Sequence, residues 1–324
     1  MKLMKNKPTL IISGEPKSIF FEIFFKSIKK NSFKSPLILI SSLRLLEYYK
    51  KKYNFKKKIK ILDKRTLNTY NLNNKEINLI NIDLKFSNKS KLDVKNTNIY
   101  IKNCFDTAFE IIKSGFSSKF INGPINKSTF LNKKYLGLTE YISDKFKIND
   151  TAMLIYNKDL SVCPLTTHLP LKLVAKKINK KNLRVKVKLV NSFFIKNLGF
   201  KPKIAVTGLN PHCESILSFN EDDKILKPAI SSLKKEGYSI SGPFSADTIF
   251  LKQNRKKYNV IIGMYHDQVL TPIKTLKEYD AINITLGLPF FRISPDHGPN
   301  QKMLNKKISN PLSLTKSLFF LDKK

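Results

Sequence analysis

Short runs of aliphatic and β-branched residues alternate with helical patterns along almost the whole chain. Residues 8–13 form the first strand pattern, residues 19–28 form an amphipathic helical pattern, and the pair recurs at 35–40 and 43–49. This alternation is typical of an α/β protein with a largely parallel sheet, because parallel neighbours need a crossover that usually folds as a helix. A chain of 324 residues, 41% of them hydrophobic, is long enough to bury such a sheet.

The alternation continues through the second half of the chain. Residues 53–98 are an exception, because they are dense in Lys and Asn with broken apolar runs, and irregular or edge structure is expected there. The other expected strands are 119–122, 152–156, 160–165, 203–207, 260–264 and 281–285, and the other expected helices are 103–115, 183–198, 225–236 and 311–321.

The organisation into domains follows from the absence of any Gly/Ser linker or internal repeat in the sequence. We predict one two-lobed α/β/α unit over residues 1–324 with a largely parallel sheet. The two lobes are approximated by residues 1–125 with 270–324, and by residues 126–269.

The lengths of the apolar runs and the spacing of the cysteines bear on the cellular compartment of the protein. No run approaches the ~18 apolar residues that would span a bilayer, and the first residues lack a signal-peptide pattern. Cys104, Cys163 and Cys213 form no CxxC pair, so neither a disulfide framework nor a cysteine zinc knuckle is indicated. We expect a soluble, cytoplasmic protein with no membrane partner.

The formal charge of +36 would ordinarily suggest a polyanion partner. Only five of the 60 basic residues are arginines, however, and the lysines are dispersed. Arginine supplies most of the bidentate contacts by which proteins recognise nucleic acids. We therefore expect a solvated lysine surface and no specific nucleic-acid partner, with a polyanion partner as the alternative.

Each of the four histidines stands where an apolar run breaks into a loop. Loops after the carboxyl ends of strands form the ligand crevice of open α/β sheets, so His168, His212, His266 and His297 can converge. The alternative for each is an isolated loop or capping histidine. Neither a GxGxxG after the first strand nor a GxxxxGK[ST] occurs, so Rossmann and P-loop phosphate sites are unsupported.

The loop motifs, taken together, resemble the 4-hydroxythreonine-4-phosphate dehydrogenases of vitamin B6 biosynthesis. They run from residue 13 to about residue 300 in the family's order. The motifs are 14–16 (GEP), 122–127 (NGPINK), 137–141 (GLTEY), 166–171 (TTHLPL), 208–212 (GLNPH), 242–248 (GPFSADT), 264–268 (MYHDQ), and 283–290 (NITLGLPF) with Arg292 and 296–298 (DHG).

The resemblance implies a fold of the isocitrate/isopropylmalate dehydrogenase type and a homodimer with its active site at the subunit interface. It also implies oxidation of 4-phosphohydroxy-L-threonine by NAD or NADP, followed by decarboxylation to 3-amino-2-oxopropyl phosphate, for pyridoxal/pyridoxine phosphate synthesis. A divalent metal, zinc, cobalt or magnesium, would lower the pKa of the substrate hydroxyl and stabilise the product of decarboxylation.

The resemblance also implies roles for specific residues. The implied metal ligands are His168, His212 and His266, with His266 reaching across the dimer. The implied substrate contacts are Thr139, Lys274, Asn283 and Arg292. Lys274, Asp247 and Asp267 are the catalytic candidates, although the two aspartates could also simply cap turns. Asp296, His297 and Gly298 are the candidate cofactor-binding residues.

The chain departs from the family pattern at Leu138, where the family has histidine in a Gly-His-Thr-Glu motif. Leucine cannot donate a hydrogen bond to a phosphate or move a proton. Two alternatives follow: a dehydrogenase of a related four-carbon acid phosphate, such as erythronate or threonate 4-phosphate, and a catalytically lapsed binding protein. The segment after residue 298 also departs from the pattern, which bears on cofactor affinity.

Overall fold

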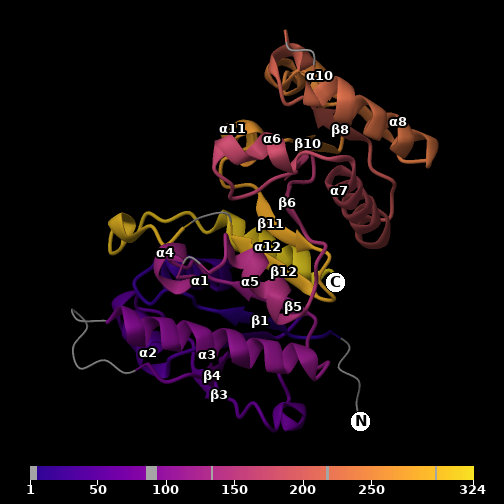
Figure 1. Ribbon diagram of the computed structural model, residues 1–324. Coiled ribbons are helices and arrows are strands. Elements are labelled where there is room, and N and C mark those ends of the chain that lie inside the picture. Colours follow the sequence, from indigo (N-terminus) through magenta and orange to yellow (C-terminus); the bar gives the residue numbers. More distant parts are fainter. Residues whose placement is uncertain (1–5, 85–92, 133, 217–218, 296–297) are drawn as a thin grey trace. The chain divides into compact units, whose positions relative to one another are not determined.

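The computed structural model describes residues 6–84, 93–132, 134–216, 219–295 and 298–324. The chain divides into unit 1, Met1–Lys134 with Pro289–Lys324, and unit 2, Tyr135–Leu288 (Figure 1). The sequence placed the second boundary near residue 270. It falls later because strand β11 (Ile282–Leu286) pairs antiparallel with β6 (Ala152–Tyr156) and so belongs to unit 2.

Unit 1 is built on parallel strands in the order β3-β4-β2-β1-β5-β12. The central strands are buried on both faces, as parallel strands between helices normally are. The strands are β1 (Thr9–Ile12), β2 (Leu37–Ser41), β3 (Ile59–Ile61), β4 (Ile77–Asn81), β5 (Lys119–Asn122) and β12 (Phe291–Pro295).

Helices cover the sheet of unit 1. Helix α3 lies against β1 and β2, and α12 packs on β1 and β12 and touches α1 (Figure 1). Aromatic rings join α1 to α2, with Phe21 stacked on Tyr49 at 4.8 Å between ring centroids. The helices are α1 (Phe20–Lys30), α2 (Leu43–Lys52), η1 (Leu67–Thr69), α3 (Val94–Lys113), α4 (Lys127–Phe130), η7 (Gln301–Met303) and α12 (Leu312–Asp322).

Unit 2 has its strands in the order β11-β6-β7-β10-β8-β9. Strand β6 is antiparallel to both neighbours, whereas β7, β10, β8 and β9 are mutually parallel. A buried cluster including Ile155, Val162, Ile261 and Val269 forms its core. The remaining strands are β7 (Ser161–Pro164), β8 (Ile204–Thr207), β9 (Ile240–Phe244) and β10 (Val260–Gly263).

The helices of unit 2 pack on this sheet, with α11 against β7 and β10 and α8 against β9. None of the described helices combines the length and the apolar character needed to cross a bilayer. The helices are α5 (Leu138–Lys145), η3 (Leu171–Leu173), α6 (Val174–Lys177), α7 (Lys180–Phe193), η4 (Phe194–Leu198), η5 (Pro211–Cys213), η6 (Asp222–Leu226), α8 (Lys227–Lys235), α9 (Ala246–Ile249), α10 (Lys252–Arg255) and α11 (His266–Lys277).

The predicted α/β class with a largely parallel sheet is confirmed. The expectation of irregular or edge structure over residues 53–98 is wrong for β4, which is buried and pairs with both β2 and β3. Its apolar residues Ile77, Leu79 and Ile80 were hidden among flanking Lys and Asn. Helix α3 also begins at Val94, nine residues before the predicted start at 103.

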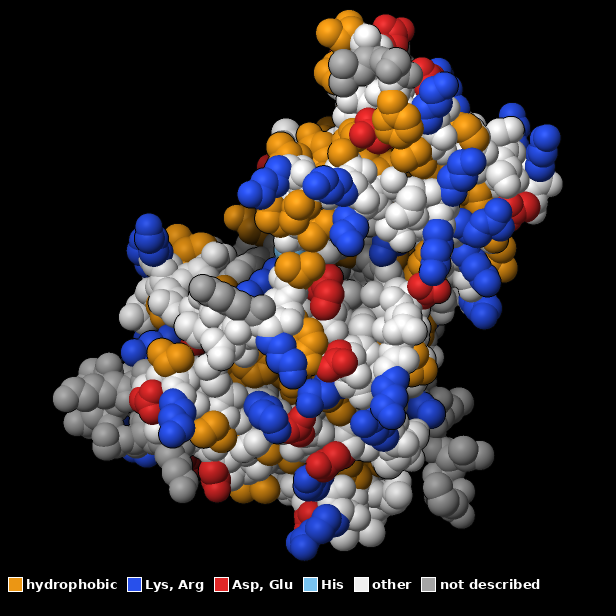
Figure 2. All heavy atoms as spheres, in the orientation of Figure 1, with side chains coloured by type: hydrophobic (Ala, Val, Ile, Leu, Met, Phe, Trp, Pro, Cys, Tyr) orange, Lys and Arg blue, Asp and Glu red, His pale blue; other side chains and the backbone are white. Residues whose placement is uncertain are grey.

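Basic side chains are spread over the visible face of both units and stand among hydrophobic and acidic ones (Figure 2). Several pair with nearby carboxylates, such as Arg184 with Glu236 and Lys64 with Glu110. This face has the dispersed lysine surface that the sequence led us to expect.

A buried carboxylate fastens the C-terminal segment to α1. Glu22 is 2% exposed, and its oxygens accept hydrogen bonds from Ser309 N–H at 2.8 Å, Ser309 Oγ at 3.0 Å and Lys26 Nζ at 2.7 Å. A buried N–H that loses its acceptor carries its full desolvation cost. Glu22 therefore holds the chain in place just before α12.

We expect Glu22→Ala to lower the free energy of unfolding by about 2–3 kcal/mol, because hydrogen bonds to a charged group are lost and Ser309 N–H stays buried. Urea denaturation measures this change. Glu47→Ala, at an exposed glutamate on α2, is the matched control and should stay within about 0.5 kcal/mol. Equal effects for the two variants would show that Glu22 is not an anchor.

Candidate functional site

Three of the histidine loops leave neighbouring parallel strands of unit 2. Strand β10 pairs with β7 on one side and with β8 on the other. His168 follows β7, His266 follows β10 and His212 follows β8. Because the carboxyl ends of parallel neighbours lie at the same edge of a sheet, the sheet itself gathers these loops.

The His168 loop is tied to the end of β10. Thr166 donates from its N–H and its Oγ1 to the carbonyl oxygen of Met264, at 3.2 and 2.8 Å. Leu165 N–H donates to the carbonyl oxygen of Gly263 at 2.7 Å. These bonds extend the β7–β10 pairing into the loop and fix the backbone beside His168.

His266 is the first residue of α11, and its ring lies close to that of His168. The two ring centroids are 5.7 Å apart and the planes are inclined by 38°. Nδ1 of His266 lies 2.6 Å from Oδ1 of Asp267. That contact occupies Nδ1, so Nε2 is the nitrogen of His266 left for a ligand.

His212 occupies a left-handed backbone conformation with φ of 56°. The loop that carries it is held by Asp222, which is fully buried. The Asp222 carboxylate accepts hydrogen bonds from the N–H of Leu209 at 2.8 Å and from the N–H and side-chain amide of Asn210 at 3.0 and 2.9 Å. A Cβ at Gly208 would lie 2.8 Å from Asp222 Oδ1, so glycine is needed there.

Gln268 connects the His212 and His266 loops. Its Oε1 accepts from Met264 N–H at 2.7 Å and from Thr207 Oγ1 at 2.8 Å, and its Nε2 donates to the carbonyl oxygen of Gly208 at 2.9 Å. One side chain thus joins the ends of β8 and β10.

Glu140, in the first turn of α5, approaches His168 around Gly137. A Cβ at Gly137 would lie 2.6 Å from His168 Nδ1 and 2.8 Å from Glu140 Oε2. Thr167 Oγ1 donates to Glu140 Oε1 at 3.3 Å. The carboxylate therefore lies beside the imidazole, in a space that only glycine leaves open.

The other site residues predicted in unit 2 have different exposures. Thr139 is buried and Lys274 is exposed on α11. Asn283 lies on β11, and its Oδ1 is buried without a hydrogen-bond partner among the described residues. Asp247 is exposed and accepts a hydrogen bond from Ser245 Oγ at 2.6 Å. That bond lowers the pKa of the Asp247 carboxyl.

Unit 1 holds the remaining motifs. Arg292 on β12 is 2% exposed, and its Nε donates to Oδ1 of Asn122 at 2.8 Å. Burial raises the pKa of Glu15, whose N–H donates to the carbonyl oxygen of Pro124. Of the predicted cofactor residues, Asp296 and His297 lie outside the described residues, and Gly298 is exposed.

The donor chemistry of the histidines suits a divalent ion such as zinc or cobalt, because both accept neutral imidazole whereas magnesium prefers oxygen ligands. His168 and His266 are brought together, and each has a carboxylate close to Nδ1. Among the described residues of this single chain, the structure forms no group of three or more His, Cys, Asp or Glu side chains that could hold a metal ion.

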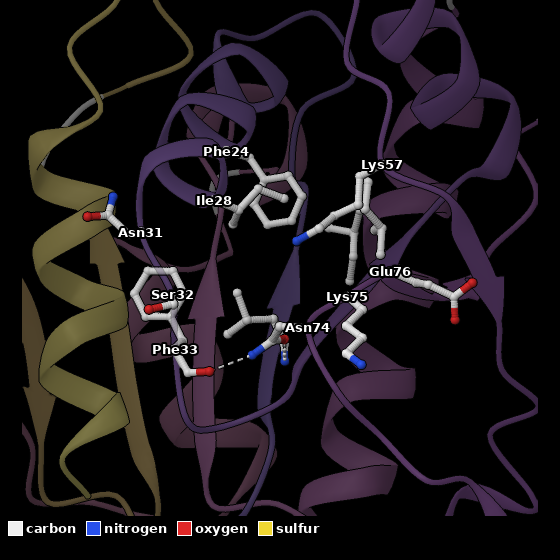
Figure 3. A pocket seen from close by; sticks show the side chains of 12 residues that line it. Phe24, Ile28, Asn31, Ser32, Phe33, Lys57, Asn74, Lys75 and Glu76 are labelled. Atoms are coloured by element: carbon white, nitrogen blue, oxygen red, sulfur yellow. Dashed lines mark hydrogen bonds between the residues drawn. The ribbon is translucent and has the colours of Figure 1, made fainter.

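A separate pocket of about 280 Å³ lies in unit 1 between α1, β2 and β4 (Figure 3). Phe24, Ile28, Leu39 and Ile77 supply apolar walls, and the Lys57 ammonium points toward Phe24 and Ile28. Burial lowers the pKa of Lys57. No residue of the predicted site lines this pocket, so it is distinct from the histidine loops.

Polar loops gathered at the carboxyl ends of a mostly parallel sheet define an α/β enzyme. The sequence model of the family described as pyridoxal phosphate biosynthetic protein PdxA matches residues 32–320. The chain belongs to this family. The 4-hydroxythreonine-4-phosphate dehydrogenase of Sulfurihydrogenibium sp. (strain YO3AOP1) is 35% identical over 312 residues, 94% of each chain.

Two further relatives extend the comparison. The crystal structure of 4-hydroxythreonine-4-phosphate dehydrogenase from Klebsiella pneumoniae superposes with a TM-score of 0.82 at 25% identity, covering 98% of this chain and 100% of that one. The D-threonate 4-phosphate dehydrogenase of Pectobacterium atrosepticum is 34% identical over 199 residues, 60% of this chain and 61% of its own. The chain is thus an enzyme of the dehydrogenase class.

Sequence reasoning assigned no role to the residues that hold these loops. Gln268 and Glu140 stand inside motifs that were recognised, at 264–268 and 137–141, so their presence was visible but their contacts were not. Asp222 lies outside every motif. Its only signal in the sequence is an acidic residue in a chain that has few of them.

We expect Asp222→Ala to lower the free energy of unfolding by about 2–3 kcal/mol, because three donors lose a buried charged acceptor. Thermal or urea denaturation measures the loss. Asp223→Ala is the matched control, since Asp223 is the exposed neighbour that pairs with Lys227, and its effect on stability should be clearly smaller. The assignment fails if Asp223→Ala is the more damaging change.

Proposed function

We propose that this chain oxidises and decarboxylates 4-phosphohydroxy-L-threonine to 3-amino-2-oxopropyl phosphate, using NAD or NADP and a divalent ion. The observation that carries the proposal is the gathering of His168 and His266 at the strand ends of a chain that belongs to the PdxA family. A divalent ion bound there would polarise the substrate hydroxyl and stabilise the negative charge left when carbon dioxide departs.

In this proposal the histidines hold the ion and other residues bind the substrate. His168, His212 and His266 supply neutral imidazole ligands. Arg292 suits the substrate phosphate, because a planar guanidinium makes paired, charge-assisted hydrogen bonds. Its burial and its bond to Asn122 fix its orientation before substrate arrives, which lowers the entropy cost of binding.

Polar residues of unit 2 are the other proposed substrate contacts. Asn283 presents a buried amide oxygen that has no hydrogen-bond partner among the described residues and can accept from a substrate amine or hydroxyl. Lys274 and Thr139 supply an ammonium and a hydroxyl as donors. Asp247 stays ionised at neutral pH, because its pKa is lowered, and can orient groups next to His212.

A second candidate function is oxidation of D-threonate 4-phosphate. Relatives of that name match 60% of the chain at 34–35% identity. At position 138, where the family has histidine, the leucine is 7% exposed and packed inside the protein. Loss of that polar contact removes a group that can distinguish substrates.

The deciding experiment is NADH or NADPH formation by the purified protein with each substrate, with zinc, cobalt or magnesium added. We expect the higher kcat/KM with 4-phosphohydroxy-L-threonine, and activity that is lost on chelation and restored by zinc or cobalt. Preference for D-threonate 4-phosphate would select the second candidate. Inactivity with both, at full metal content, would contradict both substrate assignments.

The same proposal includes a homodimer whose active sites draw residues from both subunits. Within one chain His168 and His266 already lie together, whereas the family resemblance assigns His266 to the partner's site. The histidine that crosses the interface can be identified by mixing inactive variants. A mixed dimer has one intact site only when both defects fall in the same site, and this requires the two altered histidines of that site to come from different subunits.

We expect one of two mixtures to recover about a quarter of wild-type activity, because half of randomly paired dimers are mixed and each has one intact site. Recovery from His168→Ala with His266→Ala places His266 across the interface. Recovery from His168→Ala with His212→Ala places His212 there. If neither mixture regains activity, each site is formed within one chain.

A further inference from the structure

We propose that Glu140 is a positioning residue for His168. Its carboxylate accepts a hydrogen bond from Nδ1–H of the imidazole and so presents Nε2 to the divalent ion. The inference rests on the proposed metal site, and it gives a role to a residue that the proposed reaction leaves unused.

The geometry around Gly137 carries the inference. His168 Nδ1 and Glu140 Oε2 lie within 2.6 and 2.8 Å of the point that a Cβ at Gly137 would occupy, so both atoms face one small space. Both atoms are buried from solvent, and Glu140 Oε2 has no hydrogen-bond partner among the described residues. A buried carboxylate oxygen needs a donor, and an imidazole N–H is a suitable one.

Two local features prepare the Glu140 carboxylate to accept. Thr167 Oγ1 donates to Oε1, which orients the group and leaves Oε2 for His168. Glu140 also lies in the first turn of α5, so the short distance along the chain from Gly137 keeps its carboxylate near the loop that carries His168.

The second histidine shows the same arrangement already formed. Nδ1 of His266 lies 2.6 Å from Oδ1 of Asp267, and this leaves Nε2 of His266 for a ligand. With Glu140 on His168, two adjacent imidazoles would each have a carboxylate at Nδ1 and Nε2 available. Such carboxylates fix the ring orientation and tautomer and raise the basicity of the coordinating nitrogen.

The test compares dissociation constants for zinc and cobalt in the full-length protein, measured by chelator competition. We expect Glu140→Ala to weaken binding about 10- to 100-fold and Glu140→Gln, which keeps an acceptor oxygen, to weaken it less. In the cobalt-loaded protein, the visible absorption band should shift in Glu140→Ala. Glu47→Ala, at the exposed glutamate on α2, should change neither quantity.

Gly137→Ala provides an independent variant, because its Cβ would displace both side chains. Its loss of metal affinity and that of Glu140→Ala should not add in the double variant. If Glu140→Ala fails to fold, Glu140→Gln and Gly137→Ala still decide the matter. Unchanged affinity in all of them, with wild-type binding intact, overturns the inference alone.

Two other outcomes separate the inference from the proposed function. If the wild-type protein binds neither ion, the metal site itself is wrong. If Glu140→Gln loses as much affinity as Glu140→Ala and the cobalt spectrum shows a lost ligand, Glu140 coordinates directly, and the positioning role is overturned.

Discussion

The side chain of Gln268 ties together the loops on which the proposed site depends. Its three hydrogen bonds join the end of β8 to the start of α11, through Thr207, Gly208 and Met264. Met264 in turn accepts from Thr166, so the loop after β7 joins the same network. The relative positions of the three histidine loops therefore depend on a few polar groups that bond to one another. A network of this kind positions ligands only while every member is satisfied.

Close approach, rather than turn geometry, explains why glycine is needed at several of these positions. Gly137, Gly208 and Gly263 have no positive φ, yet a Cβ at each would come within 3 Å of a side-chain atom that holds a loop. At Gly208 the neighbours are Cys213 and Asp222, and at Gly137 they are His168 and Glu140. Side chains of these loops occupy the space that each glycine leaves, so an alanine at any of the three positions would displace a loop side chain.

The alternation of strand and helix patterns was sufficient to predict the sheet. The histidine motifs predicted loops that converge, and the rings of His168 and His266 lie close together, whereas their metal-binding role stays a prediction. Two kinds of feature were not predicted from the sequence. Strand β4 was not predicted because its short apolar run is flanked by Lys and Asn, which mask the strand pattern in the sequence. The contacts of Asp222 were not predicted because its partners include backbone N–H groups, which nearly every residue has, so the sequence gives no sign of the hydrogen bond. Contacts across long sequence separations are set by the fold, so they become visible only with it.

The composition of the chain explains why these carboxylates stand out. With 24 acidic residues against 60 basic ones, carboxylates are scarce in this chain. Lysine has donors but no acceptor, so it cannot replace a group that must receive a backbone N–H or an imidazole N–H. Glu22 and Asp222 are buried in that accepting role, and the proposed role of Glu140 is the same. In a strongly basic protein, a buried acidic residue is therefore better evidence of a specific contact than a lysine at the surface. Among these three carboxylates, Glu140 is the one whose proposed partner, His168, is a proposed metal ligand.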